Sequence, residues 1–321
     1  MSSSHTEQLS SAYSKARPDC KHGMQPWPVG RDTGPEAQLK ATVLRAGVSL
    51  PVVAAFQGLV YQFYREQGRQ LPWRGGFHPD PYRVLVSEVM LQQTQVDRVI
   101  PRFTAFIERF PDAQALADAS LTELLTAWQG LGYNRRALNL QRAARMIVEL
   151  WGGSLPDDPV LLQQLPGIGP YTAGAVAAFA FNRPQVFLET NIRAVLLHCF
   201  FADQEGVTDK ELLPVVEAVL DRAEPRTWYN ALMDYGSDLK RRFPNPSRRS
   251  RHHTRQSRFE GSDRQLRGAV LRFLLVAGGA TLATLRKQLD TEEDRLARIL
   301  EGMLEDGFLS RQGRKFTIPS T

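Results

Sequence analysis

Apolar residues recur at intervals of three and four along most of the chain, a spacing that places them on one face of a helix. This spacing predicts helices over residues 51–67, 83–99, 101–109, 113–117, 121–128, 134–151, 192–202, 209–222 and 226–239. Towards the C-terminus, three further helices are predicted to start near Arg267, Thr281 and Asp294. Two short strands around Gln312 and Gly313 follow them, so the fold class expected is all-α apart from this end.

The same spacing divides the chain into four segments. Residues 1–50 are rich in Ser, Gly and Pro, lack a sustained period, and are predicted to be a flexible N-terminal extension. Residues 51–239 are predicted to form a helical domain, and residues 240–262 a basic linker. The remaining residues, 263–321, are long enough for a small second domain.

A turn rich in glycine and proline, LPGIGP at 165–170, lies between two of the apolar runs. Gly167 and Gly169 allow the backbone to turn tightly. A helix that begins at Pro170 leaves its first N–H groups without intrahelical partners, and such groups bind phosphate. The turn could therefore bind a phosphate of a nucleic-acid backbone. An ordinary connection between two helices has the same composition and is the alternative.

Two acidic residues stand out because of their neighbours in the sequence. Glu88 lies within an apolar run, RVLVSEVML, where burial would raise the pKa of the carboxyl and let it donate a proton. A helix glutamate turned towards solvent is the alternative. Glu189 directly precedes a predicted helix, whose dipole would keep the carboxylate ionised.

The composition of the chain limits which partners and cofactors are expected. The net charge of +6 favours an anionic partner. The two cysteines, Cys20 and Cys199, cannot build a four-cysteine iron–sulfur site, and a disulfide framework is not expected. His252 and His253 lack partner ligands, so no metal is expected. Because no apolar run is long enough to cross a bilayer and no signal-peptide pattern is present, a cytoplasmic, nucleoid-associated protein is expected.

Several motifs, in order along the chain, carry a resemblance to a known family. They are PWR at 72–74, SEVMLQQTQV at 87–96, GLGY at 130–133, LPGIGPYTAGA at 165–175, LETNIRAVL at 188–196 and NALMDYG at 230–236. Over 71–239 the chain resembles the helix-hairpin-helix (HhH-GPD) DNA glycosylases, the superfamily of endonuclease III and of the MutY-type adenine glycosylases. The resemblance implies an all-α, two-lobed HhH-GPD glycosylase fold. The segment 263–321 resembles a winged-helix domain, where full-length MutY-type enzymes have a Nudix-like domain.

The resemblance implies roles for individual residues at matching positions. Glu88 would protonate the leaving base, and Glu189 would stabilise the positive charge that develops on the sugar. Tyr171 and Asn191 would surround that sugar. The implied DNA contacts are Trp73 and Arg74 at the rim of the base pocket, Gln93 and Thr94 beside the opposite base, Leu131 and Tyr133 as a wedge in the stack, and Gly167 and Gly169 at a phosphate. Core packing is the alternative for Trp73, Leu131, Tyr133 and Tyr171, and helix capping for Asn191.

The chain departs from the family pattern in three ways. Endonuclease III-like lyases have lysine where this chain has Tyr171, and a phenol cannot form a Schiff base, so a monofunctional glycosylase is predicted. Glu189 replaces the usual aspartate, which moves the carboxylate outward by about 1.5 Å. The iron–sulfur cysteines give way to a basic run over 240–259, in which Arg248, Arg249 and Arg251 are predicted to contact the DNA backbone. A flexible linker is the alternative for this run. The arginines at 135, 136, 142 and 145 are candidates for phosphate contacts, and simple solvation is the alternative for some of them.

The function that the resemblance implies is removal of a mispaired adenine, opposite 8-oxoguanine or G, from double-stranded DNA, and we expect a monomer that flips the base out of the stack. No cofactor is expected, and whether a monovalent ion occupies the hairpin is left open. Two alternatives remain. One is a relative that removes thymine or uracil opposite guanine, because those mismatch glycosylases also carry tyrosine after the hairpin. The other is a DNA-binding protein on a scaffold that has lost catalysis.

Overall fold

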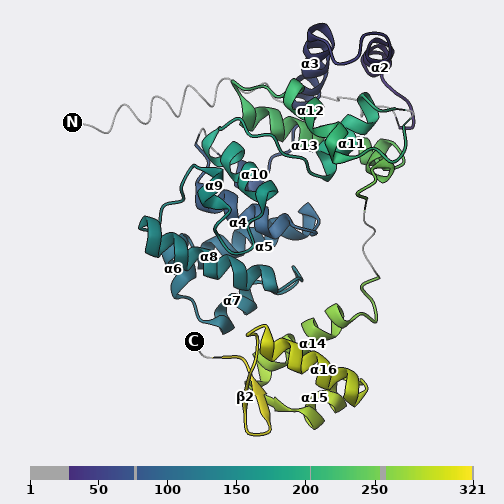
Figure 1. The fold of residues 1–321 in the computed structure, drawn as a ribbon. Coiled ribbons are helices and arrows are strands. Elements are labelled where there is room, and N and C mark those ends of the chain that lie inside the picture. Colours follow the sequence, from purple (N-terminus) through teal and green to yellow (C-terminus); the bar gives the residue numbers. More distant parts are fainter. Residues whose placement is uncertain (1–28, 76–77, 203, 254–257, 320–321) are drawn as a thin grey trace, which may run out of the picture. The chain divides into compact units, whose positions relative to one another are not determined.

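A computed structural model of the chain describes residues 29–75, 78–202, 204–253 and 258–319 (Figure 1). Helices dominate it, as the apolar spacing predicts. The chain divides into two compact units. The first combines residues up to Arg69 with Thr190–Val219 and Asn230–Arg251, and the second combines Gln70–Glu189, Leu220–Tyr229 and the residues from His252 onwards. None of the helices in the described part of the chain is long and apolar enough to cross a membrane.

The first unit is a helical bundle that combines an N-terminal segment of the chain with segments that follow residue 189. Its helices are α2 (Gly34–Ala46), α3 (Leu50–Gln67), α11 (Thr190–Cys199), α12 (Asp209–Val219), the later part of α13 (Pro225–Arg242) and the short 3-10 helix η2 (Pro246–Arg249). Aromatic rings from α3 hold the bundle together. Phe56 meets Phe200 edge to face with ring centres 5.0 Å apart, and Phe63 packs against Tyr235 at 5.2 Å. Burial of such rings stabilises this unit.

Helix α2 lies within the segment that the sequence predicts to be a flexible extension. The expectation does not hold for residues 34–46, which form a regular helix with a capping box between Thr33 and Glu36. Glu36 is 1% exposed and receives hydrogen bonds from the phenol of Tyr235, at 2.6 Å, and from the guanidinium of Arg242. An ion pair inside the bundle therefore fixes α2 in place. Residues 1–28, with Cys20 among them, lie outside the described part.

The second unit contains the helices around the predicted active site. They are η1 (Pro72–Arg74), α4 (Pro81–Leu91), α5 (Val96–Arg109), α6 (Ala113–Asp118), α7 (Leu121–Ala127), α8 (Arg135–Trp151), α9 (Pro159–Leu162) and α10 (Pro170–Phe181). The single helix predicted over 83–99 is wrong, because α4 ends at Leu91 and α5 begins at Val96. Between them Gln93 adopts a left-handed backbone with φ of +56°, which no continuous helix allows.

The C-terminal residues of this unit form a small mixed fold. Three helices, α14 (Asp263–Ala277), α15 (Leu282–Leu289) and α16 (Glu293–Glu305), agree with the three predicted ones. The strands β2 (Ser310–Gln312) and β3 (Lys315–Thr317) form the predicted hairpin, with Gly313 at φ of +60° in its turn. A further strand, β1 (Ala280–Thr281), pairs with β3 and was not expected. The assignment of this fold to the winged-helix class stays a prediction.

Candidate active site

Glu88 lies inside α4, a helix with almost no exposed face. Asp80 caps the first turn by accepting the Tyr82 N–H, and Pro81 occupies the first helical position, where a missing N–H costs nothing. All residues from Val84 to Met90 are buried, because the helix has an apolar residue on every side. Glu88 itself is 7% exposed. The alternative of a solvent-facing glutamate is therefore excluded.

The surroundings of Glu88 favour its protonated form. Burial raises the pKa of this carboxyl to about 7, and the negative charge of Glu189 acts in the same direction. Two neighbours oppose the shift. The phenol of Tyr171 donates a hydrogen bond to Oε2 of Glu88 at 3.4 Å, and the positive charge of Arg74 also lowers the pKa. A carboxyl with such a pKa can hold a proton near neutral pH and release it to a base.

Glu189 and Tyr171 complete a group of three side chains around one point of the second unit. Glu189 is half-buried, and its charge raises the pKa of both Glu88 and Tyr171. Burial is the largest cause of the raised pKa of Tyr171, followed by the charges of Glu88 and then Glu189. The Tyr171 ring meets Phe187 edge to face at 5.7 Å. The structure thus brings together three of the four residues that were predicted to act on the base and the sugar.

Asn191, the fourth, belongs to the first unit and is positioned there by two helices. It lies in the first turn of α11, and its Oδ1 accepts a hydrogen bond of 2.8 Å from Lys240 of α13. Gly236 of α13 lies against the Asn191 backbone so closely that a Cβ at 236 would come within 2.3 Å of the Asn191 carbonyl oxygen. A glycine is required at this crossing, and it explains the glycine of the NALMDYG motif. The predicted role of Asn191 at the sugar stays a prediction.

The hairpin forms as predicted. The helix α10 begins at Pro170, with Gly169 as its N-cap and no side chain covering the first N–H groups. Gly167 has φ of +79°, and a Cβ there would come within 2.9 Å of the side chain of Asn139. Both glycines are exposed. The loop therefore presents backbone N–H groups at the surface, the arrangement that binds a phosphate oxygen.

The Gln92–Gln95 turn and the 129–134 loop are joined by Arg136, which the sequence suggested as a phosphate contact. Its guanidinium donates instead to backbone carbonyls at the end of α4 and in the loop, namely those of Val89, Met90, Gln92, Leu131 and Gly132. It also donates to Oγ1 of Thr94 at 3.0 Å. Burial lowers the pKa of Arg136 to about 10. The phosphate role of Arg136 is wrong, and only tertiary contacts reveal the structural one.

Two of the predicted DNA contacts are buried. Leu131 is 2% exposed, which contradicts its presentation outward as a wedge; its carbonyl accepts from Arg136, and its side chain belongs to the core. Trp73 is 7% exposed and packs edge to face on Phe103 at 5.3 Å, so it is a core residue of η1. Tyr133 remains half-exposed, as does Arg74, whose charge acts on Glu88.

The basic run divides into structural and exposed arginines. Arg249 was predicted to contact DNA, but its guanidinium donates to the carbonyls of Leu197, Phe201 and Ala202, and so caps the end of α11. Arg248 and Arg251 are exposed, so their predicted phosphate contacts stay open. The flexible-linker alternative fails for residues 246–250, since η2 is regular and Ser247 and Ser250 are buried.

The described ranges contain no group of three or more His, Cys, Asp and Glu side chains that could hold a metal ion. Cys199 is a free thiol inside the first unit, where burial raises its pKa to about 12. A thiol with so high a pKa is a poor metal ligand and a poor nucleophile at neutral pH. The titratable side chains that the structure brings together at the candidate site are those of Glu88, Glu189 and Tyr171.

Comparison with known proteins places the chain among DNA repair enzymes. A family model described as the HhH-GPD superfamily base excision DNA repair protein matches residues 86–218. The human adenine DNA glycosylase is 37% identical over 243 residues, which cover 70% of this chain and 44% of the human protein. The adenine DNA glycosylase of Mycolicibacterium smegmatis is 36% identical over 272 residues, which cover 78% of this chain and 90% of that protein.

The extent of these matches varies between relatives. The chain spans about half the length of several curated relatives, 44% of the human protein and 52% of the adenine DNA glycosylase of Buchnera aphidicola subsp. Baizongia pistaciae. Among solved structures, a thermostable thymine-DNA glycosylase shares the fold with a TM-score of 0.51 and 24% identity, over 58% of this chain and 86% of that one. Since the mycobacterial relative is matched over nine-tenths of its length, the chain belongs to the HhH-GPD superfamily of base excision DNA repair proteins, and its sequence is similar to that of adenine DNA glycosylases.

Proposed function

We propose that the chain is a monofunctional DNA N-glycosylase that removes adenine from a mispair in duplex DNA. The observation that carries the proposal is the buried Glu88, whose pKa is raised to about 7, beside Glu189. Cleavage of a glycosidic bond requires an acid and an anion; Glu88, with its raised pKa, would supply the acid, and Glu189 would supply the anion. The relatives that match most of the chain's length carry the name adenine DNA glycosylase.

The steps follow from the side chains at the site. The target nucleotide leaves the stack, because the acid cannot reach a base inside the duplex. Glu88 then donates its proton to a ring nitrogen of the base while the bond from that base to C1′ of the sugar breaks. The bonding electrons leave with the base, and the carboxylate of Glu189 stabilises the positive charge left on the sugar. Water then adds to C1′ and loses a proton to the carboxylate of Glu88, which restores the acid and leaves an abasic site.

The absence of an amine at position 171 supports hydrolysis without strand cleavage. A lyase needs a lysine to form a Schiff base with the sugar, and Tyr171 cannot form one. Its phenol instead donates to Glu88 at 3.4 Å, which positions the acid. DNA treated with the protein should therefore contain intact strands until the abasic sites are cleaved with alkali. Strand scission before alkali would overturn the monofunctional assignment.

A panel of duplexes tests the substrate. Adenine opposite 8-oxoguanine, adenine opposite guanine, thymine opposite guanine and uracil opposite guanine are each incubated with the protein, and abasic sites are then cleaved with alkali. We expect product only from the adenine duplexes. Product only from the pyrimidine duplexes would assign the chain to thymine or uracil removal, and tight binding without any product would assign it to DNA binding alone.

Glu189 provides the first mutational prediction. Replacing it by glutamine keeps the size of the side chain and removes the charge that stabilises the sugar, so we expect Glu189→Gln to lose about 100-fold or more in the single-turnover rate. Glu189→Asp keeps the carboxylate and should stay within about ten-fold of the wild type. If the glutamine variant is as active as the aspartate variant, the charge of Glu189 has no part in the reaction.

The second mutational prediction concerns the exposed arginines of the basic run. Neutralising Arg248 and Arg251 together should flatten the dependence of log affinity on log salt by about 0.9 for each lost phosphate contact. The matched control neutralises Arg45 and Arg65, which are exposed elsewhere in the same unit. Fluorescence anisotropy on one duplex at several salt concentrations measures both slopes. Equal slopes in the two double variants would remove Arg248 and Arg251 from the DNA interface.

A further inference from the structure

The extended segment that ends in Glu189 is anchored by a buried aromatic ring. Residues 182–189, all of which the structure describes, join α10 to α11 outside any helix or strand. Phe187 is 4% exposed, whereas Val186 is exposed and Leu188 is half-buried. Because the segment has no regular structure of its own, the position of Glu189 depends on the contacts that other elements make with it.

Tyr229 of α13 contacts this segment through its phenol and through its ring. The hydroxyl donates a hydrogen bond to the carbonyl of Gln185 at 2.6 Å. Burial raises the pKa of this phenol, and a hydrogen bond from the backbone of Phe187 opposes the shift. The rings of Tyr229 and Phe187 stack with their centres 4.0 Å apart and their planes inclined by 27°. One side chain, itself fully buried, therefore bonds to the segment two and four positions before Glu189.

The start of α13 is fixed in turn to the end of α10. Arg226, three positions before Tyr229, donates to the carbonyls of Phe179 at 2.6 Å and Ala180 at 2.9 Å. The last carbonyls of a helix lack intrahelical partners, so this guanidinium satisfies groups that would otherwise need water. The phenol of Tyr229 is therefore held against the same helix that carries Tyr171.

Phe187 links the segment to the side chains around the proposed acid. Its ring meets the Tyr171 ring edge to face at 5.7 Å, and Tyr171 donates to Glu88 at 3.4 Å. A Cβ at Gly174 of α10 would come within 3.3 Å of the Phe187 ring, so this glycine gives the ring room against the helix. The stacked pair of rings thus connects the first turn of α13 with the site of the reaction.

We infer that Tyr229 is a positioning residue of the reaction: by holding residues 185–187, it keeps the carboxylate of Glu189 beside Glu88. The inference rests on the proposed function and deepens it, because it assigns the placement of the anion to a residue of α13. A misplacement of about 1 Å can cost about 100-fold in rate, so the hold on the backbone before Glu189 affects catalysis.

A titration of Glu88 in the free protein tests the inference. Burial raises the pKa of Glu88, and the charge of Glu189 acts in the same direction. Tyr171 and Arg74 oppose the shift. Tyr229→Phe keeps the stacked ring and removes the hydroxyl, so the segment loosens, Glu189 moves away and the titration midpoint of Glu88 should shift to lower pH. Carbon NMR of protein that carries isotope-labelled glutamate measures the midpoint, and Glu88→Gln identifies the resonance.

Two further variants show whether Tyr229 acts through Glu189. In Glu189→Gln the charge is absent, so adding Tyr229→Phe should leave the midpoint of Glu88 where it is, whereas independent effects would add. Tyr82→Phe is the matched control, because the phenol of Tyr82 is also buried and donates to a backbone carbonyl, that of Phe110, at 3.0 Å. Urea unfolding should show a similar loss of stability in the two tyrosine variants, without a shifted midpoint in Tyr82→Phe.

Single-turnover excision of adenine should fall about 10- to 100-fold in Tyr229→Phe, with duplex affinity retained, and should stay near the wild type in Tyr82→Phe. An unchanged rate or Glu88 midpoint in Tyr229→Phe, an equal shift in Tyr82→Phe, or a further shift in the double variant would overturn the inference. The titration uses no DNA, so it is independent of the duplex panel. A wild type whose Glu88 midpoint depends on Tyr229 but which excises no adenine would overturn the proposed function alone.

Discussion

Replacement of Glu88 by glutamine is expected to lower the rate of adenine excision by about 10²- to 10⁴-fold, the range that a general acid contributes, while duplex binding is retained. The amide keeps the size of the side chain and cannot protonate the base. Single-turnover excision and anisotropy on the same duplex measure the two quantities. Glu108→Gln, an exposed acid on α5, is the control and should leave both unchanged. An active Glu88→Gln variant would remove Glu88 from the role of acid.

The role of Glu88 should also appear in the pH dependence of the excision rate and of stability. Burial and the charge of Glu189 raise the pKa of Glu88 to about 7, so the excision rate of the wild type should fall as the pH rises through that value. The folded state binds this proton more tightly than the unfolded chain does. Between the ordinary value of 4.5 and about 7, stability therefore falls as the pH rises. Glu88→Gln should lack this decline and should gain stability relative to the wild type at pH 8, measured by urea unfolding at both ends of the range.

Replacement of Glu36 by glutamine is expected to cost about 3–5 kcal/mol of unfolding free energy. The change leaves the guanidinium of Arg242, of which the side chain is 3% exposed, without one of its two carboxylate partners. It also weakens the bond from Tyr235 that helps to fix α2. Urea unfolding followed by circular dichroism measures the loss. Arg241→Gln, a change at an adjacent residue of α13 with 76% exposure, should cost no more than about 1 kcal/mol.

The contribution of Glu36 should also depend on pH. Burial alone would raise the pKa of this carboxyl, but hydrogen bonds from Arg242 and Tyr235 lower it below 4.5. A lowered pKa means that the ion pair stabilises the protein at neutral pH and that this stability is lost as the pH falls through the lowered pKa. The difference between the wild type and Glu36→Gln should accordingly shrink in acid. An equal difference at pH 7 and pH 3 would show that Glu36 does not act through its charge.

The features that the sequence predicted correctly are those set by local pattern. A single acid among apolar residues indicated that Glu88 is buried, since a helix with apolar residues on every side leaves no exposed position. Gly169 and Pro170 located the start of α10 because they are the residue types favoured at that boundary. The capping box of Ser120 and Glu123 at the start of α7 has the same local origin, because it depends on two residues three positions apart.

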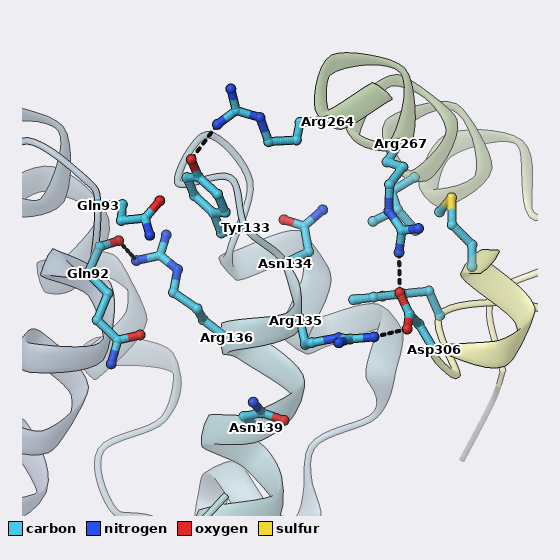
Figure 2. A pocket seen from close by; sticks show the side chains of 13 residues that line it. Gln92, Gln93, Tyr133, Asn134, Arg135, Arg136, Asn139, Arg264, Arg267 and Asp306 are labelled. Atoms are coloured by element: carbon cyan, nitrogen blue, oxygen red, sulfur yellow. Dashed lines mark hydrogen bonds and ion pairs between the residues drawn. The ribbon is translucent and has the colours of Figure 1, made fainter. Parts of the chain in front are cut away.

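The features that the sequence did not predict depend on contacts between distant segments. The sequence predicted phosphate contacts for Arg136 and Arg249, and only the fold brings backbone carbonyl groups within their reach. Leu131 could be a wedge or a core residue, and its neighbours in space decide between them. Helix α2 was missed because its pattern is weakly amphipathic and its stability comes from Arg242, some two hundred positions away. The ion pairs of Asp306 that Figure 2 shows were missed for the same reason.

The carbonyl contacts of Arg136 have a consequence for how this protein can respond to its ligand. One guanidinium group is bonded both to the last turn of the acid-bearing helix and to the loop before α8. Neither segment can shift far without breaking hydrogen bonds to this shared guanidinium, so we expect a displacement of the loop to move the backbone at the end of the helix that carries Glu88.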